Sequence, residues 1–515
     1  MVVKGYASAL HGVNAITITV EANAISSAEL GTFIIGLPDA SVKESIFRCD
    51  AAIRNSGYEP LRQKAVINLA PADIRKEGSA YDLPIALCML ASNFQVAQEH
   101  LSEYIVMGEL GLDGSVLPIK GALPIAIQAM KDKFKGVILP ISNAKEAAIV
   151  KDIEVYGVKN LREASEFING TRTLQRVISD ARGDFQLALN DYDVDFSDVQ
   201  GQDNVKRAME IATAGGHNIL LFGPPGAGKT MLAKRLPTIM PPMNLYEALE
   251  TTKIHSVAGR LGTDASLMAV RPFRAPHHTV SDVALVGGGS NPQPGEISLA
   301  HNGVLFLDEM PEFKRTVLEV LRQPLEERKI TISRSRWSVD YPANFMLVAS
   351  MNPCPCGYHN HPTKDCKCLP GSISRYMSKI SGPLLDRMDI HLEVMPVSHE
   401  DLTNKDKKGK ERSEDIRNRV LAAREIQAKR YDDLKGVHCN AMVAANKYNN
   451  WFDLPVAGQL LLKSAMQKLN LSARAYDKIV KLSRTIADLA QSEAIQIEHV
   501  AEAIHFRSLD REERM

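Results

Sequence analysis

The residues best suited to chemistry form one glycine-rich stretch near the middle of the chain. Residues 223–230 read Gly-Pro-Pro-Gly-Ala-Gly-Lys-Thr; they follow the apolar run 219–222 and open a segment compatible with a helix. Backbone N–H groups of such a loop, the helix N-terminus and Lys229 can surround the phosphates of a nucleotide, while Thr230 offers a hydroxyl to Mg²⁺. The stretch therefore predicts a site for ATP and Mg²⁺ built from Gly223, Pro224, Pro225, Gly226, Ala227, Gly228, Lys229, Thr230 and Met231.

Two later apolar runs end in polar residues that would make this site hydrolytic. Residues 303–307 lead into Asp308 and Glu309, and residues 345–351 lead into Asn352. Asp308 can hold Mg²⁺ through its water shell, Glu309 can orient and deprotonate the attacking water, and Asn352 can touch the γ-phosphate or that water. A strand end or a capping asparagine would look the same in isolation, but the preceding glycine-rich loop favours the functional interpretation.

Four of the seven cysteines lie together at residues 354–368. Two C-x-C pairs separated by a short polar loop can supply four thiolates to one tetrahedral Zn²⁺, which predicts a zinc knuckle. Reduced free thiols are the alternative, and His359 and His361 are spare ligands within the same loop. The predicted zinc ligands are Cys354, Cys356, Cys366 and Cys368.

In chain order these segments resemble the phosphate-binding loop, Walker B motif and sensor 1 of AAA+ ATPases. Residues 381–394 resemble the arginine-finger segment of magnesium-chelatase-like and MCM-like members, with Arg387 at the finger, and Arg474 falls at sensor 2. A finger guanidinium meets charge that develops on phosphoryl oxygens and comes from a neighbouring subunit, so the resemblance implies a ring. By the same resemblance, residues 199–202 contact the nucleotide base.

The predicted catalytic set is thus Glu309, Lys229, Asn352, Arg387 and Arg474. Either of the last two arginines, taken alone, is equally compatible with a surface ion pair. The sequence leaves open whether Arg474 acts on its own subunit's nucleotide or on a neighbour's.

Two basic segments point toward a nucleic-acid partner. Residues 271–290 resemble the helix-2 insert of this clade, and the alternation in residues 328–342 is typical of a hairpin. In a ring such segments project to the pore, where cations grip phosphates and aromatic rings stack on bases. An ordinary exposed hairpin and a histidine metal site are the alternatives. The DNA-binding candidates are Arg274, His277, His278, Lys329, Arg334, Arg336 and Trp337.

Composition sets limits on this interpretation. Lysine plus arginine and aspartate plus glutamate both total 61 in 515 residues, so no overall basic field marks a nucleic-acid partner, and DNA binding depends on local loops. The length predicts about two to four domains. The N-terminus lacks a signal-peptide pattern, and there is no apolar run of about 18 residues, so we expect a cytoplasmic protein without a membrane partner.

Residues 1–170 alternate strand-like and helix-like runs, which indicates an α+β or α/β domain. The expected strands are 16–20, 65–69 and 136–139, and the expected helices are 41–57, 83–92 and 123–130. Residues 68–85 and 108–123 resemble the two active-site segments of the Lon protease domain, which implies a ribosomal S5 domain 2-like fold. The serine of that family falls on Ala80 and its lysine on Leu123, with Ser79 and Lys120 shifted in position, so we expect no Ser-Lys dyad and no proteolysis.

The remaining organisation follows from these elements. A polar linker is expected over 171–194, an AAA+ α/β core over 195–400 with the knuckle at 354–368, and a helical lid of magnesium-chelatase type over 401–515. The lid helices are predicted at 416–430, 460–469, 473–489 and 497–506.

The combination of a Lon-like domain, this core, the knuckle and the lid resembles the ComM/YifB family over the whole chain. The resemblance implies a homohexameric ATPase that encircles single-stranded or branched DNA. It further implies branch migration of recombination intermediates, notably in natural transformation, with recombination proteins as partners. The alternatives are a magnesium chelatase motor subunit, another AAA+ remodelling ATPase, and an ATP-dependent protease, which Ala80 and Leu123 disfavour.

Overall fold

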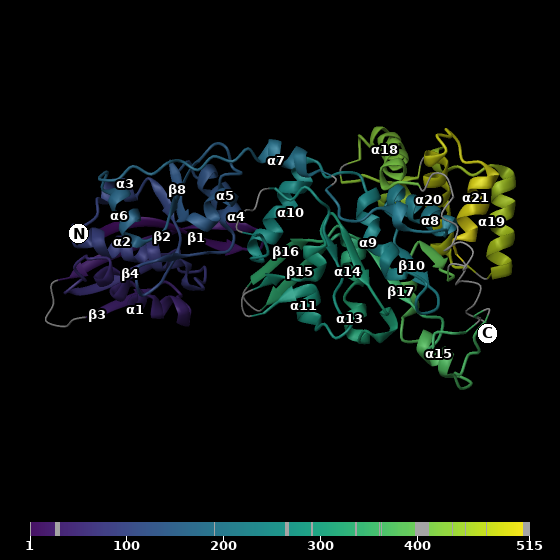
Figure 1. Ribbon diagram of the computed structural model, residues 1–515, viewed down its shortest axis with the longest axis horizontal. Helices are drawn as coiled ribbons and strands as arrows, with labels where there is room; N and C mark the ends of the chain where they lie inside the picture. The colour runs from purple at the N-terminus through teal and green to yellow at the C-terminus, as the bar shows by residue number, and fades with distance from the viewer. Residues whose placement is uncertain are drawn as a thin grey trace.

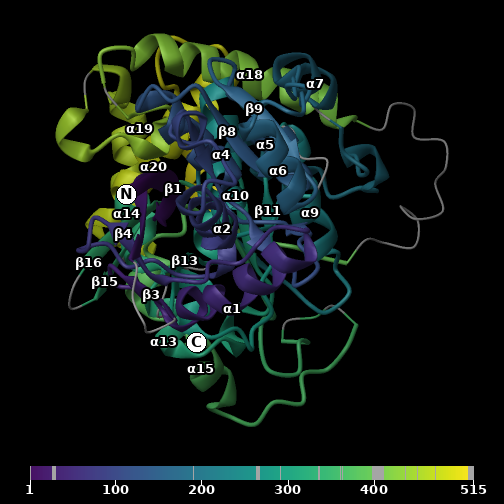
Figure 2. The same ribbon diagram turned by 90° about the vertical axis from the view of Figure 1, so that its left-hand side faces the viewer.

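The computed structural model describes residues 2–25, 31–189, 191–262, 267–289, 292–334, 337–359, 361, 363–396, 411–434, 436–448, 450–469 and 471–507. Arg336 lies outside these residues, and the side chains of Arg334 and Trp337 are likewise not described. Three parts lie in a row: the N-terminal domain, a central core and a C-terminal group of helices (Figure 1). Figure 2 looks along this row with the N-terminal domain nearest the viewer.

The N-terminal domain is built on a seven-stranded sheet of mixed direction, ordered β3-β4-β2-β1-β5-β8-β9. Its strands are β1 (Val2–His11), β2 (Asn14–Ile25), β3 (Gly31–Ile35), β4 (Lys64–Ala70), β5 (Tyr104–Val106), β8 (Gly136–Pro140) and β9 (Glu154–Val158). β2 pairs antiparallel with β1 and β4, and the other neighbours run parallel. The predicted strands at 16–20, 65–69 and 136–139 are confirmed.

Helices cover this sheet because the residues that face it are apolar. α2 is the most deeply placed, with Leu83, Ile85 and Leu87 fully buried. The helices are α1 (Ala40–Asn55), α2 (Asp82–Ser92), α3 (Gln98–Leu101), α4 (Ala122–Lys131), α5 (Ile141–Ala147) and α6 (Leu161–Ile168), with a small ribbon of β6 (Glu109–Leu110) and β7 (Val116–Leu117). The three helices predicted in this part of the chain are confirmed.

The core is a parallel sheet ordered β11-β14-β17-β10-β18. Its strands are β10 (Ile219–Phe222), β11 (Phe273–Arg274), β14 (Val304–Leu307), β17 (Met346–Met351) and β18 (Ile390–Glu393). Every residue of β10, β14 and β17 is buried, as expected for parallel strands covered on both faces. Because the first strand in sequence lies between the fourth and the fifth, the order reverses beside β10, and ligands of such sheets bind there, beyond the carboxyl ends of the strands.

Helices and small ribbons surround the core sheet. The longer helices are α8 (Asp203–Gly215), α9 (Lys229–Ile239) and α10 (Leu245–Val257), and the shorter ones are α11 (Asp282–Val286), α12 (Glu296–Leu299), α13 (Arg315–Glu319), α14 (Arg322–Glu327), α15 (Ser372–Met377) and α16 (Gly382–Leu385). β15 (Lys329–Arg334) and β16 (Trp337–Pro342) form the predicted hairpin, and β12 (Gly287–Gly288) and β13 (Gln293–Pro294) form a shorter one.

The C-terminal part is helical, as predicted. It contains α18 (Ser413–Arg430), α19 (Val456–Leu469), α20 (Ala473–Leu489) and α21 (Ile497–His505). α18 packs on α8 and α9, and α20 packs on α8 and α21. Arg484 on α20 is completely buried and pairs with Asp488, which also receives Arg430 from α18, so a satisfied ionic network joins the two helices. None of the described helices has the length and apolar content to cross a lipid bilayer.

The segment between the first two parts differs from the polar linker predicted at 171–194. It contains α7 (Ala181–Ala188), whose Ala181 and Phe185 are buried in one cluster with Leu123 of the N-terminal domain and Met243 of the core. Only two apolar residues anchor this helix, which is why the composition of the segment indicated a linker. The backbone N–H of Gly121 also donates to the carbonyl of residue 256 at 3.1 Å, so the two parts are in direct contact.

Candidate nucleotide and metal sites

The glycine-rich loop joins β10 to α9 at the carboxyl edge of the core sheet. Gly226 and Gly228 have φ angles of 80° and 89°, a backbone conformation that side chains disfavour, and α9 begins at Lys229. A Cβ at Gly223 would lie 2.1 Å from the carbonyl oxygen of Val394, so the loop passes too close to the next strand for any other residue. The loop and the N-terminus of α9 together form an anion-binding geometry.

Lys229 holds this loop together through three hydrogen bonds. Its amino group donates to the carbonyl oxygens of Gly223 and Pro224 at 2.7 and 3.0 Å and to Oδ1 of Asn352 at 3.1 Å. Only 8% of the residue is exposed, and burial lowers the pKa of Lys229. Lys229 and Asn352, which the sequence predicts to contact the same phosphate, are 123 positions apart in the chain and contact each other directly.

Thr230 and Asp308 form the hydroxyl–carboxylate pair that a magnesium ion requires. The Thr230 hydroxyl donates to Oδ2 of Asp308 at 2.7 Å. The other carboxylate oxygen of Asp308 accepts the hydroxyl of Ser350 and the backbone N–H of Glu309, the latter at 3.2 Å. Such hard oxygen ligands suit Mg²⁺ bound together with phosphates.

Ser350 was missed by the sequence prediction. It is fully buried in β17, two residues before Asn352, and it orients Asp308 from the neighbouring strand. The available signal was a single serine inside an otherwise apolar strand, because a buried hydroxyl requires a hydrogen-bond partner.

Glu309 is held in a strained backbone conformation at the end of β14. Its φ is 52°, in the left-handed region that residues other than glycine seldom adopt, and its N–H faces the Ser350 hydroxyl at 3.2 Å. The side chain is exposed, whereas its neighbour Asp308 is half-buried. Backbone strain of this kind costs about 1–3 kcal/mol and is concentrated at functional sites, and here it directs a carboxylate into open space beside the loop.

Residues 199–202, which precede β10, and Met395, which follows β18, fix the remaining side of the loop. Val199 is buried, and Gln202, with φ of 57°, donates from Nε2 to the carbonyl of Ala227 at 3.0 Å and to that of Met395 at 3.3 Å. Residues 199–202 therefore lie against the phosphate-binding loop, where the AAA+ resemblance places a contact with the nucleotide base.

The two predicted arginines lie at the opposite edge of the sheet. The carbonyl of Arg387 accepts the side-chain amide of Asn218, the residue that precedes β10, whereas the loop follows β10. A strand of this length separates the two edges by about 13 Å. Arg387 contacts the carbonyl of Pro383 and the carboxylate of Glu326.

Arg474 lies close to Arg387. Its guanidinium, 65% exposed at the side chain, is 3.0 Å from the carboxylate of Asp386, the residue before Arg387. The hydrogen bonds and ion pairs of the two arginines go to residues outside the loop at 223–230.

A buried ionic cluster fixes this second edge. Asp389 accepts the backbone N–H of Asn218 at 2.8 Å, pairs with Lys478 of α20 at 2.5 Å and lies 3.6 Å from the ring of His217. Burial alone would raise the pKa of Asp389, but the neighbouring charges of Lys478 and His217 outweigh it and hold that pKa well below its usual range. The segment that carries Arg387 is thereby fixed to β10 and to α20.

The four cysteines come together as a compact cluster. The sulfur of Cys354 lies 3.3 Å from that of Cys356 and 3.7 Å from that of Cys366, and those of Cys356 and Cys366 are 3.6 Å apart. All four sulfurs, Cys368 included, lie within 4.8 Å of one another, and none is in a disulfide. A tetrahedral zinc with Zn–S bonds near 2.3 Å requires sulfur separations of about 3.8 Å, so the cluster fits that ion.

The sulfur atoms have unequal surroundings. The backbone N–H of Tyr358 lowers the pKa of Cys356 to about 6, whereas burial raises the pKa of Cys354 to about 12. His359 and His361 are outside the group of ligand atoms, and in the described part of the chain these four cysteines are the one cluster of metal-ligand type. The prediction of spare histidine ligands is therefore not supported by the geometry.

Three family models match the chain. The models described as "Magnesium chelatase, subunit ChlI", "Subunit ChlI of Mg-chelatase" and "Magnesium chelatase, subunit ChlI C-terminal" match residues 195–402, 20–143 and 410–507, respectively. Relatives similar over the full length include the protein YifB of Escherichia coli strain K12, 42% identical over 512 residues, which covers 97% of this chain and 96% of that protein.

A second full-length relative is the competence protein ComM of Haemophilus influenzae, 40% identical over 506 residues, 98% of this chain and 97% of that protein. The chain belongs to the ComM/YifB family. The magnesium-chelatase 38 kDa subunit of Rhodobacter capsulatus is 25% identical over 254 residues, 45% of this chain and 68% of that subunit. The ComM/YifB family is thus a magnesium-chelatase-like branch of the AAA+ proteins, with an ATPase role and the ATP and Mg²⁺ which that role implies.

The DNA-binding candidates of this ComM/YifB family member have different surroundings. Arg274 is paired at both nitrogens with the Glu296 carboxylate at 2.6 and 2.7 Å, so its charge is already neutralised. His277 is exposed, and its ring lies 4.0 Å from that of His278. Lys329 is exposed at the base of the hairpin, 3.0 Å from Asp340.

The tip of this hairpin is where Arg334 pairs with Trp337 in the backbone register. His277 and His278 are not part of any metal-type cluster among the described residues.

The positions singled out by the Lon resemblance have the following surroundings in this family member. Ser79 and Lys120 line one cavity of about 790 Å³ between the domain and the core, and the Ser79 hydroxyl donates to Glu109 at 2.5 Å. The Lys120 stem packs on Gly259 of the core, and Leu123 is completely buried.

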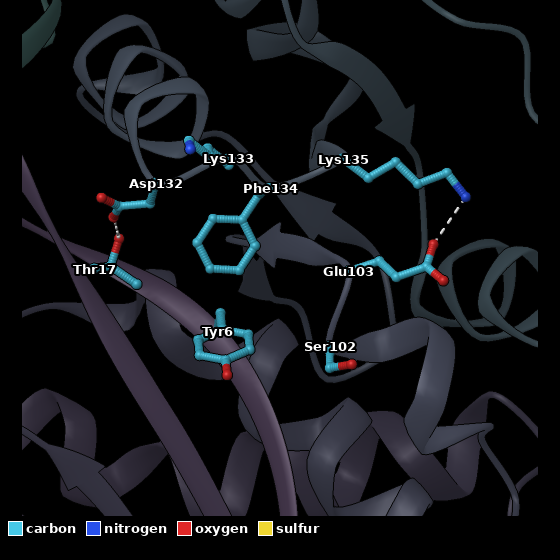
Figure 3. Close-up of a pocket in the computed structure, with 8 residues that line it drawn as sticks. All are labelled: Tyr6, Thr17, Ser102, Glu103, Asp132, Lys133, Phe134 and Lys135. Atoms are coloured by element: carbon cyan, nitrogen blue, oxygen red, sulfur yellow. Dashed lines mark hydrogen bonds and ion pairs between the residues drawn. The ribbon is translucent and has the colours of Figure 1, made fainter.

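A second hollow of about 760 Å³ lies in the same domain (Figure 3). Tyr6 and Phe134 meet edge to face at its centre with ring centroids 4.9 Å apart, and Lys135 is 2.8 Å from Glu103 (Figure 3). The carboxylate of Asp132 accepts the Thr17 hydroxyl at 2.5 Å. These polar groups satisfy one another, so the hollow presents no nucleophile with a base and no set of metal ligands.

Proposed function

We propose that the protein is an ATP-hydrolysing motor that works as a homohexameric ring and moves along DNA, acting as a branch-migration translocase on recombination intermediates. One observation carries the proposal: Lys229, Thr230 and Asp308 lie at one edge of the core sheet, whereas Arg387 and Arg474 lie at the other. A single chain cannot bring these two edges to one nucleotide. A ring of copies, each presenting its arginine edge to the next subunit's loop, completes every site.

Each residue has a stated part in this composite site. The loop amides and Lys229 bind the phosphates, and Thr230 and Asp308 hold Mg²⁺. Asn352 moves from its bond with Lys229 to the γ-phosphate or the attacking water, and Glu309 takes a proton from that water. Arg387 of the neighbouring subunit stabilises the charge that develops on the transferred oxygens.

Arg474 acts on the neighbour's nucleotide together with Arg387. The support is its ion pair with Asp386, which places it beside the finger of its own chain and away from its own loop. Both arginines therefore approach the phosphate of the adjacent subunit from one surface.

The DNA part of the proposal depends on the hairpin of β15 and β16 and on the similarity to the competence protein ComM. The printed name of the Haemophilus influenzae relative is a competence protein, and DNA uptake with recombination is the setting we propose for this chain in the cytoplasm, with recombination proteins as partners. Lys329, Arg334, Arg336 and Trp337 of the hairpin would line the pore, joined by His277 and His278. Arg274 contributes only if its pair with Glu296 opens.

The remaining parts of the proposal concern organisation. We assign residues 1–170 to a Lon-protease-like domain of ribosomal S5 domain 2-like fold without the dyad, 195–400 to the AAA+ core and 401–515 to the lid. The cysteine cluster holds structural Zn²⁺, which the sulfur separations support. A magnesium chelatase motor is less favoured because the match to the Rhodobacter capsulatus 38 kDa subunit covers 45% of the chain, whereas the matches to YifB and ComM cover 97% and 98%.

A junction assay tests this function directly. Purified protein is mixed with a labelled four-stranded DNA junction and either ATP or a non-hydrolysable analogue, with Lys229→Ala as the matched control. We expect the junction to be separated into duplexes with ATP but not with the analogue. We also expect ATP turnover to rise when DNA is added. Absence of both effects would overturn the DNA-motor function. Activity with a chelatase partner and porphyrin would favour the chelatase alternative instead.

A further inference from the structure

The cysteine knuckle, residues 354–368, lies directly against the phosphate-binding loop. Gly357 has a φ of 84°, and a Cβ at this position would lie 2.5 Å from Cδ and 2.7 Å from Cγ of Pro225. The backbone of the knuckle is therefore in van der Waals contact with the third residue of the loop. A turn closed by the N–H of Gly357 and the carbonyl of Cys354, at 2.9 Å, fixes this approach.

The knuckle is also joined to the nucleotide site through the chain itself. Cys354 follows Asn352 by two residues, and Asn352 accepts the Lys229 amino group at 3.1 Å. Beyond the cluster the chain returns to the same place, because buried Tyr376 on α15 meets the backbone of Asn352. Both ends of the knuckle thus meet at the residue that faces the γ-phosphate position.

The knuckle has almost no apolar core that would hold it in this position. Between residues 353 and 371 the buried residues that the structure describes are Cys354 and Gly357, and no helix or strand falls there. Leu369, the large apolar side chain of the segment, is 77% exposed. Small domains with so little burial are ordered by a metal ion, whose binding free energy replaces that of a core.

We propose that Zn²⁺ bound by Cys354, Cys356, Cys366 and Cys368 clamps the phosphate-binding loop and Asn352 in the geometry needed for ATP turnover, although the metal never touches the nucleotide. The inference rests on the ATP site of the proposed function. With zinc bound, Gly357 supports Pro225 and the chain after β17 holds the Asn352 amide. Without it the four sulfurs separate, and both the loop and the amide lose their support.

The first test removes Cys366 and Cys368, the ligand pair that lies farther along the chain from Asn352. Cys366→Ser/Cys368→Ser is purified alongside wild type, and zinc is measured by mass spectrometry, binding of a fluorescent ATP analogue by titration, and ATP turnover without DNA. We expect zinc to fall from one ion per chain to none and turnover to fall about 100-fold, the loss typical of a displacement near 1 Å at a reacting centre. His361→Ala, in the same loop, is the matched control and retains zinc and turnover.

A second variant separates the clamp from the metal. Gly357→Ala keeps all four thiols, so we expect it to bind zinc, while its Cβ would collide with Pro225 and lower turnover and ATP binding. A zinc-selective chelator applied to wild type with Mg²⁺ in excess should remove ATP binding, and added Zn²⁺ should restore it. These two measurements test the proposal even where a variant fails to fold.

Two results would overturn the proposal. One is a zinc-free protein with wild-type ATP affinity and turnover, and the other is wild-type protein that neither contains zinc nor takes it up. Because these readouts need no DNA, a zinc-replete protein that hydrolyses ATP but moves no junction would refute the DNA-motor function and leave the clamp standing.

Discussion

The two edges of the core sheet are organised in opposite ways. At the carboxyl edge, Lys229, Thr230, Asp308 and Asn352 hydrogen-bond to one another and to the loop, and all of these groups can turn toward a ligand. At the amino edge the backbone is fixed by the fully buried Asp389 and its neighbours, while Arg387 extends to the exposed carboxylate of Glu326 and Arg474 to the half-buried carboxylate of Asp386. One edge is a preassembled binding site, and the other is a rigid support for two arginines.

The difference supports the proposal that one fold serves two neighbouring sites. Exposed ion pairs contribute only about 0–1 kcal/mol, so Arg474, with 65% of its side chain exposed, can exchange Asp386 for a phosphate at little cost. The Arg387 side chain is only 13% exposed, so its pair with Glu326 is held more firmly. The buried cluster at Asp389 cannot rearrange in this way, since an unpaired buried charge costs several kcal/mol.

The largest expected effect is at the carboxyl edge. Glu309→Gln keeps the size and hydrogen-bonding of the side chain but removes the base, so ATP turnover should fall about 10³-fold while ATP binding persists. Turnover by coupled enzyme assay and binding by titration check this, with the exposed Glu312→Gln as the control. Normal hydrolysis by Glu309→Gln would remove Glu309 from the role of base.

The next effect concerns the rigid edge. Lys478→Met leaves the Asp389 carboxylate buried without its cation, and we expect the protein to lose about 3 kcal/mol of stability. Denaturant unfolding monitored by fluorescence checks this, with exposed Lys463→Met on α19 as the control. Equal stability of the two variants would show that Asp389 does not depend on Lys478.

The same cluster should give stability a defined pH dependence. Because the pKa of Asp389 is depressed in the folded protein, its contribution is present in full above its unfolded-state pKa of about 3.9 and is lost as pH falls through the folded value. The stability difference between wild type and Asp389→Asn should therefore persist from pH 8 down to pH 5 and shrink below about pH 4. A difference that shrinks already between pH 8 and 5 would contradict this assignment.

The smallest expected effect concerns Glu326, the carboxylate that Arg387 would exchange for a phosphate. Glu326→Gln removes the carboxylate that Arg387 contacts, and turnover of the assembled ring should rise about twofold to threefold, because the exposed Glu326 carboxylate no longer competes with phosphate for the guanidinium. Glu327→Gln, one residue along the same helix, is the control. A tenfold loss would instead mean that Glu326 positions the finger.

The carboxyl edge was largely predictable from the sequence. A parallel sheet brings the carboxyl ends of its strands to one edge, so the polar residues that follow three apolar runs, Lys229, Asp308 and Asn352, had to lie near one another, and the structure places them in contact. The helices and strands followed from apolar periodicity in the same way. Cysteine spacing likewise predicted four sulfurs that the structure brings together.

The amino edge and the knuckle contact were not predictable, because they join segments far apart in the chain. Asp389 meets Asn218 across 171 positions, and no local pattern marks a buried aspartate that will find a lysine on a distant helix. The approach of Gly357 to Pro225 depends on the fold of both loops. Arg274 looked available for DNA because its partner Glu296 lies beyond the basic segment.

A mixing experiment tests the central claim that each ATP site is built from opposite edges of two subunits. Glu309→Gln and Arg387→Ala proteins are each expected to hydrolyse almost no ATP; the second loses about 10³-fold because a finger is absent. Mixed rings contain interfaces where an intact Glu309 meets an intact Arg387, so turnover should reappear on mixing and follow the proportion of such interfaces. A mixture no more active than either protein alone would contradict the account.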